Sequence, residues 1–120
     1  MLTNTALLIA ALIQIESSGR DYVTGDDGRA WGCLQIHAGV IQDVNRIAGT
    51  HYRHKDAFDR GKAIKICMTY LRHYTSRHRL GHKPTMKDMA LCWNQGPNWY
   101  RKTPNEHYWR KVKRELDRLK

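Results

Sequence analysis

The sequence predicts a mainly α-helical protein. Apolar residues recur at intervals of three and four in several segments, one of which contains Val40, Ile41, Val44 and Ile47. This spacing places the apolar side chains on one face of a helix. No segment shows the sustained apolar–polar alternation of a half-buried strand, so helices are expected to form the fold.

Three elements are expected in the first half of the chain. Thr3 or Asn4 caps a helix that runs to about Glu16, and the Ser-Ser-Gly sequence at 17–19 ends it. Residues 21–31 are rich in Gly and Asp, which predicts a loop with a short hairpin around residues 26–28. A second helix is expected over residues 38–48, with Gly49 as its stop.

Three further helices are expected in the second half. The longest starts near Asp59, followed by a basic, Gly-broken segment at 77–83. Thr85 precedes a helix that runs to about Trp93 and ends before a Gly-Pro pair at 96–97. The last helix is predicted to start with Thr103 as N-cap, with Pro104 in its first turn and Glu106 completing a capping box.

Length and charge restrict the class of protein. A chain of 120 residues predicts one domain over residues 1–120. The net charge of +10 favours contact with polyanions, namely nucleic acid, anionic membrane or an acidic cell wall, and does not select among them. No Lys or Arg precedes Arg20, and the apolar run at 6–15 is too short to cross a bilayer. We therefore expect this run to be a core helix rather than an export signal.

The cysteines and histidines do not predict a metal or redox site. Cys33, Cys67 and Cys92 are widely spaced without a C-x-x-C pair, so each is expected to be a small buried apolar residue, with a disulfide between two of them left open. The pairs His51/His54 and His78/His82 have helical spacing but no evident third ligand. No metal and no cofactor are expected.

Glu16 is the first candidate for a catalytic residue. It follows an apolar helix and stands directly before the Gly-terminated turn. If this carboxyl group faces a cleft, desolvation raises its pKa, which is the property that a general acid near neutral pH requires. The alternative is a solvated residue in the last turn of a helix.

Four segments in a fixed order give Glu16 its context. They are Glu16-Ser17-Ser18-Gly19, Gly32-Cys33-Leu34-Gln35-Ile36, Ala90-Leu91-Cys92-Trp93-Asn94-Gln95-Gly96 and Tyr108. This order resembles the motif set of goose-type lysozymes and soluble lytic transglycosylases, which reads Glu-Ser, Gly-Leu-Met-Gln, Ala-Tyr-Asn-x-Gly and a Tyr on the last helix. The resemblance extends from Glu16 to Val112 and implies a lysozyme-like helical domain with a substrate cleft. It also implies cleavage of the glycan strands of bacterial peptidoglycan.

The resemblance implies roles for several side chains. Glu16 is the expected general acid, with Ser17 holding its carboxyl group and the Tyr108 hydroxyl pointing towards it. Gln35, Asn94 and Gln95 carry amides that donate to and accept from sugar hydroxyl and acetamido groups; these residues, with Ser17 and Tyr108, are the expected substrate-binding set. Gly32 is expected where backbone and sugar approach closely. Trp31 and Trp93 offer flat apolar faces to either the cleft or the core.

The chain departs from the family pattern at positions that affect the mechanism. Cys33, Leu34 and the Cys92-Trp93 pair replace other apolar residues. The goose-type enzymes carry an Asp two residues after the motif Gln, where this chain has His37, whereas Asp26 matches the spacing of their other cleft Asp. Hydrolysis with inversion needs a second carboxylate about 6.5–9.5 Å from the acid. Asp26 is the candidate for that base, with Asp27 beside it; the alternative is that both acids only shape a turn.

Two reactions therefore remain open for such an enzyme, and two other classes of protein are alternatives to it. A transglycosylase forms a 1,6-anhydro sugar without a second carboxylate, and His37 favours this outcome over hydrolysis by Glu16 and Asp26. The rivals are a basic helical module that binds nucleic acid and an inactive wall-binding relative. The expected partner is peptidoglycan, with electrostatic contact between the protein and anionic wall polymer or membrane, for example through the basic run at 110–114. We expect a monomer that acts on the bacterial cell wall, as a phage-encoded lysin would.

Overall fold

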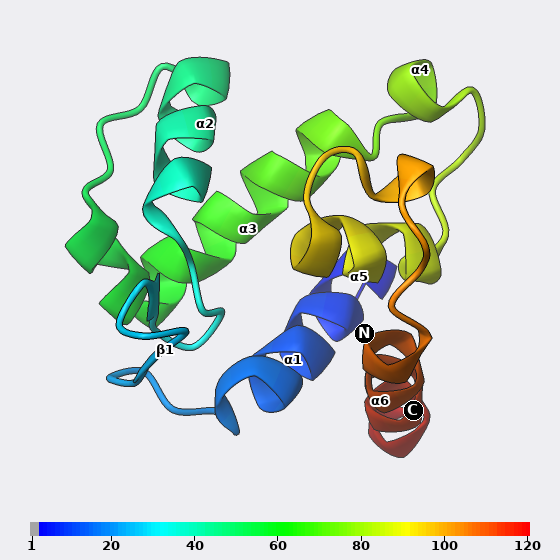
Figure 1. Cartoon of the computed structure of the whole chain (residues 1–120), viewed down its shortest axis with the longest axis horizontal. Coiled ribbons are helices and arrows are strands. Elements are labelled where there is room, and N and C mark those ends of the chain that lie inside the picture. Colours follow the sequence, from blue (N-terminus) through cyan, green and yellow to red (C-terminus); the bar gives the residue numbers. More distant parts are fainter. Residues whose placement is uncertain (1–2) are drawn as a thin grey trace. The chain divides into compact units, whose positions relative to one another are not determined.

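The computed structural model describes residues 3–120 and is mainly α-helical, which confirms the predicted fold class (Figure 1). No helix within these residues is long and apolar enough to cross a membrane. In chain order the elements are α1 (Asn4–Ser17), β1 (Thr24–Gly25), β2 (Ala30–Trp31), α2 (Ala38–Ala48), the 3₁₀ turn η1 (His54–Phe58), α3 (Arg60–Tyr74), α4 (Arg77–Leu80), α5 (Met86–Gln95), the 3₁₀ turn η2 (Trp99–Arg101) and α6 (Glu106–Leu119).

The backbone groups into two compact units. Residues 13–70 form one, here called the hairpin unit; residues up to 12 together with 71–120 form the other, here called the C-terminal unit. The boundaries fall inside α1 and α3, so each of these helices contributes to both units. The existence of one catalytic domain over residues 1–120 stays a prediction.

The hairpin unit is built from the end of α1, the β1–β2 hairpin, α2, η1 and most of α3. The strands pair antiparallel, with Thr24 opposite Trp31 and Gly25 opposite Ala30. This confirms the predicted hairpin, and β2 contacts η1. The unit buries the following apolar side chains: Ile13, Ala30, Cys33, Leu34, Ile36, Ile41, Val44, Ala57, Ala63, Ile66, Cys67 and Tyr70.

The elements of the C-terminal unit are all helices or helical turns within its described residues, joined by short loops. Helix α5 packs against α6 and η2. Helix α6 is strongly amphipathic, because its basic side chains at 110, 111, 113 and 114 are exposed while Val112 is fully buried. The buried apolar side chains of this unit are Leu8, Ile9, Ala11, Leu12, Leu71, Met89, Ala90, Leu91, Cys92, Trp99, Tyr108, Val112 and Leu116.

Most predicted helix ends are confirmed by their hydrogen bonds. The Thr3 hydroxyl accepts the Ala6 N–H at 3.1 Å, so Thr3 caps α1. The Asp59 carboxylate accepts the Lys62 N–H at 3.0 Å at the start of α3. The Thr85 hydroxyl accepts the Asp88 N–H at 3.0 Å, and α5 ends two residues beyond the predicted position.

The predicted start of α6 was wrong. Asn105, not Thr103, is the N-cap, and its side-chain oxygen accepts the Tyr108 N–H at 3.1 Å. Thr103 instead offers its carbonyl to Gln95, and the Glu106 carboxylate pairs with Lys87 Nζ at 2.9 Å rather than closing a capping box. The side chains of Gln95 and Lys87 in α5 therefore hold Thr103 and Glu106 away from a capping box. The local sequence motif at 103–106 does not encode these contacts.

Three short helical turns were not predicted, namely α4, η1 and η2. Helix α4 occupies part of the basic segment at 77–83, where the Ser76 hydroxyl caps it and Gly81 ends it in a left-handed conformation. The turn η1 starts with two reciprocal hydrogen bonds between Arg53 and Asp56. The Arg53 N–H donates to the Asp56 carboxylate at 2.8 Å, and the Asp56 N–H donates to the Arg53 carbonyl at 2.9 Å. A single turn is too short to show helical periodicity in a sequence.

Candidate functional site

Glu16 lies in the last turn of α1 and is half-buried. The chain leaves the helix through two left-handed residues, Ser18 (φ +54°) and Gly19 (φ +79°). Arg60 from α3 holds this exit, because its guanidinium donates to the Gly19 carbonyl and pairs with Asp21 at 2.9 Å. The backbone that carries Glu16 is therefore fixed by contacts on its C-terminal side.

Ser17, the neighbour of Glu16, is almost fully buried, at 3% exposure. Its hydroxyl donates to the Ile13 carbonyl one turn earlier, at 2.9 Å. The only hydroxyl proton of Ser17 is thus used inside its own helix rather than on the Glu16 carboxyl group. Substrate contact by Ser17 stays a prediction.

Asp26 lies in the turn of the β1–β2 hairpin. Asp26 (φ +53°) and Asp27 (φ +56°) are both left-handed, a conformation that Asp tolerates better than most residues. The Asp26 carboxylate contacts two nitrogen-bearing side chains: His37 Nε2 at 3.1 Å and Arg29 Nη2 at 3.6 Å. At 52% side-chain exposure, this arrangement adds only about 0–1 kcal/mol of stability per pair, so its main effect is to orient the carboxylate. Asp27 is exposed.

Gln35 closes a tight loop that follows the hairpin. An antiparallel bridge joins Trp31 and Ile36, so residues 32–35 form a closed turn in which Gln35 has a φ of +52°. Gln35 Nε2 donates to the Gly32 carbonyl at 2.9 Å. A Cβ placed on Gly25 would lie 2.3 Å from Gln35 Oε1, so the amide lies directly against the hairpin strand.

The expectation that Gly32 lies where the backbone and a sugar approach closely was wrong. Gly32 is buried, and a Cβ added to it would lie 1.9 Å from the Ala57 carbonyl oxygen. The close approach is therefore to the backbone of η1 and not to a sugar. With a φ of +82°, this position requires glycine for the fold of the loop.

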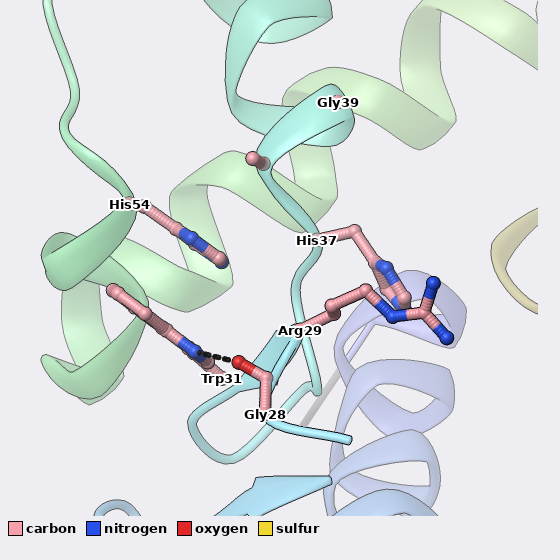
Figure 2. Close-up of a pocket in the computed structure, with 7 residues that line it drawn as sticks. Gly28, Arg29, Trp31, His37, Gly39 and His54 are labelled. Carbon is pink, nitrogen blue, oxygen red and sulfur yellow. Dashed lines mark hydrogen bonds between the residues drawn. The ribbon is translucent and has the colours of Figure 1, made fainter. Parts of the chain in front are cut away.

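A pocket of about 370 Å³ opens beside the hairpin, between Trp31, His54, Arg29, His37 and the start of α2 (Figure 2). The Trp31 and His54 rings stack with centroids 3.7 Å apart, and Trp31 Nε1 donates to the Gly28 carbonyl at 2.6 Å. Figure 2 shows Arg29 and His37 pointing away from this stack. Aromatic surface beside nitrogen donors can bind a sugar ring and its hydroxyl groups.

Sequence reasoning missed Arg29 as a pocket residue and considered His54 only as a metal ligand. His54 Nε2 lies 2.7 Å from the Ile36 carbonyl, so this nitrogen carries the proton. No group of three or more His, Cys, Asp or Glu side chains within residues 3–120 is arranged to hold a metal ion. No local sequence signal points to His54, because its partner Ile36 lies 18 residues earlier in the chain.

Asn94 and Gln95 end helix α5 in the C-terminal unit. Gln95 uses both ends of its amide within the chain: Nε2 donates to the Thr103 carbonyl at 2.9 Å, and Oε1 accepts the Asn105 N–H at 3.0 Å. Asn94 Oδ1 accepts from Asn105 Nδ2 at 2.9 Å, and the Asn94 side chain is exposed. Gln95 therefore positions residues 103–105, while Asn94 faces solvent.

Tyr108 follows this network in the first turn of α6 and is 6% exposed. Asn105 links the three predicted residues, because its side chain contacts Asn94 and its Oδ1 caps the Tyr108 N–H. Sequence reasoning missed Asn105 as an N-cap. Asn is a favoured residue for this position, and an N-cap side chain accepts the N–H three residues later, here that of Tyr108. Asn94, Gln95 and Tyr108 thus belong to one network, while Glu16, Ser17, Asp26 and Gln35 lie in the hairpin unit.

The three cysteines are all buried and no disulfide joins them. Burial raises the pKa of the Cys92 thiol to about 12, against a smaller opposite effect of the Arg79 charge. Burial also raises the pKa of Cys33. These two thiols are therefore protonated at neutral pH, which excludes them as thiolate nucleophiles.

Comparison with known proteins adds the family. The family model described as the transglycosylase SLT domain matches residues 3–116, nearly the whole chain. Searches of curated proteins and of solved structures gave no match. The matched range contains all four motif segments, from Glu16 to Tyr108. The chain therefore belongs to the transglycosylase SLT domain family, a membership that supports an enzyme activity of the peptidoglycan lytic transglycosylase type.

Proposed function

We propose that this protein cleaves the β-1,4 bond between N-acetylmuramic acid and N-acetylglucosamine in peptidoglycan, with Glu16 as general acid and base. The observation that carries the proposal is the family match over residues 3–116, which includes Glu16 at the end of α1. Glu16 is half-buried beside Ser17, in a turn that Arg60 holds in place. A fixed, partly desolvated carboxyl group suits proton transfer to a glycosidic oxygen.

The proposed reaction uses one carboxyl group twice. Protonated Glu16 donates its proton to the glycosidic oxygen as the bond from C1 of the muramic residue to that oxygen breaks. The C6 hydroxyl of the same residue then attacks C1, and the Glu16 carboxylate accepts its proton. A C1–O6 bond replaces the broken bond, Glu16 returns to its protonated form, and no water is consumed. The products are a 1,6-anhydro end and a free 4-hydroxyl.

The alternative reaction is hydrolysis with Asp26 as the base that activates water. The Asp26 carboxylate is 3.1 Å from His37 Nε2 and 3.6 Å from Arg29 Nη2. A carboxylate that two neighbouring side chains already contact has fewer oxygen lone pairs free to orient and deprotonate a water. These contacts support the anhydro product over the hydrolytic one.

We also propose that the substrate is met at the bacterial cell wall and that the net charge of +10 draws the protein, as a monomer, to anionic wall polymer. A phage particle, a host cytoplasm before release, or export by another route would suit such an enzyme.

Mass analysis of released muropeptides tests the reaction. Purified peptidoglycan is digested with the wild-type protein, and the ends of the products are identified. Products lighter by one water than their reducing forms support the transglycosylase reaction. Reducing muramic ends would instead establish the muramidase, and intact glycan strands would refute both reactions.

A further inference from the structure

The basic segment at 77–83 has no role in the proposed reaction, yet it lines a pocket of about 190 Å³ in the C-terminal unit. In Figure 1 this segment includes α4. Trp99 forms a buried wall, at 4% exposure, and Tyr100 forms a rim, at 52% exposure. The residues that line the pocket are Arg79, Leu80, His82, Asp88, Trp99 and Tyr100.

The Arg79 guanidinium is held over aromatic rings. Its Cζ lies 5.4 Å from the centroid of Tyr74, 5.9 Å from that of Trp99 and 5.3 Å from that of Tyr100. Nη1 donates to the Tyr74 carbonyl at 3.0 Å. No carboxylate within residues 3–120 forms a salt bridge with Arg79, in contrast to Arg60. Arg79 is therefore an oriented cation that forms no salt bridge with an acidic side chain.

Asp88 brings a fixed carboxylate to the same pocket. Its Oδ2 accepts the Thr85 N–H at 2.9 Å as part of the capping box of α5. Asp88 and Arg79 line one pocket, but they form no salt bridge with each other. The pocket thus presents a cationic donor and an anionic acceptor at separate points on an apolar wall that Leu80 and Trp99 provide.

We propose that this pocket binds the carboxylate end of a short peptide. The guanidinium pairs with the carboxylate, because its fork of N–H groups matches two carboxylate oxygens. Asp88 accepts a peptide N–H or an ammonium group, and the apolar wall takes a small side chain. A phosphodiester backbone carries no N–H donor for Asp88 and brings negative charge against it, which disfavours that ligand. On the proposed function, the peptide is the stem peptide of peptidoglycan.

Direct titration of the full chain tests the site. The probes are the isolated stem tetrapeptide, the same peptide amidated at its C-terminus, inorganic phosphate and a single-stranded oligonucleotide, each followed by calorimetry or NMR. We expect the wild type to bind the tetrapeptide. Arg79→Gln should weaken this binding about 10–100-fold, the value of a charge-assisted pair. Arg79→Lys should recover part of the loss, because it keeps the charge without the fork.

Arg72→Gln is the matched control, because Arg72 is an exposed arginine on α3 and its replacement changes the net charge equally. It should bind the tetrapeptide as the wild type does. Circular dichroism checks that each variant is folded; if Arg79→Gln is not, Arg79→Lys and the amidated peptide carry the test.

Several results would overturn the proposal. They are no tetrapeptide binding by the wild type at millimolar concentration, equal binding of the amidated peptide, phosphate binding of equal strength, and binding of the oligonucleotide alone. The titration contains no glycan, so it is independent of cleavage. A chain that binds the tetrapeptide but cuts no glycan would refute the proposed function and keep this site, and the reverse result would refute the site only.

Discussion

Gly32→Ala should destabilise the whole protein, because of two separate effects at this position. The new Cβ would lie 1.9 Å from the Ala57 carbonyl oxygen and 2.7 Å from its carbon, both backbone atoms that have no rotamer to change. The φ of +82° also places a side chain in the left-handed region. The left-handed conformation costs about 1–2 kcal/mol, and forcing an atom into a filled site costs about 1–3 kcal/mol.

Together these effects predict a loss of about 2–5 kcal/mol in the free energy of unfolding, a large part of the roughly 5–15 kcal/mol of a typical domain. Two other glycines separate the effects. Gly49 has a φ of +65° with open space around it, so Gly49→Ala should lose only about 1–2 kcal/mol. Gly39 has open space and no left-handed φ, so Gly39→Ala should gain about 0.4–1 kcal/mol.

Urea unfolding followed by circular dichroism measures the three differences in the free energy of unfolding. In thermal unfolding, the melting temperature should fall by roughly 3–6 °C for each kcal/mol lost. A Gly32→Ala variant as stable as the wild type would refute the contact with η1. If that stable variant also lost activity, the earlier expectation of a sugar contact at Gly32 would be restored.

Glu16→Gln should lower glycan cleavage by about 10²–10⁴-fold with an unchanged circular dichroism spectrum, because the amide cannot transfer the proton; near-normal cleavage would remove Glu16 from its role. Asp26→Asn should change cleavage little if the product is the anhydro sugar, whereas a folded, inactive variant with reducing ends in the wild type would establish hydrolysis. Lysis of whole cells should slow between low and physiological salt while cleavage of a neutral oligosaccharide does not, because salt screens the +10 charge; equal responses would contradict electrostatic attraction. Iodoacetamide at pH 9 should modify Cys92 in urea but not in the native protein, because burial raises its pKa to about 12; equal rates would contradict that burial.

Local signals in the sequence were enough for most helices. Thr3, Asp59 and Thr85 cap the helices that they precede, and Gly49 ends α2 where predicted. These signals work because a cap satisfies backbone groups within three or four residues. The start of α6 shows where they fail. The Thr103–Glu106 motif fits a capping box, but Gln95 and Lys87 bind these residues from another helix.

The features of the candidate site also separate into those that local sequence signals indicate and those that depend on tertiary contacts. The sequence by itself determined the fold class, the family resemblance and the choice of Glu16 as the candidate acid, because helical periodicity and motif order are properties of the chain. The tertiary structure decided that Gly32 lies against Ala57, that His37 and Arg29 contact Asp26, and that Arg79 lies over Trp99 and Tyr100. Most of these contacts join residues far apart in the chain, and such pairings depend on packing and long-range hydrogen bonds, for which a single sequence carries no spacing rule.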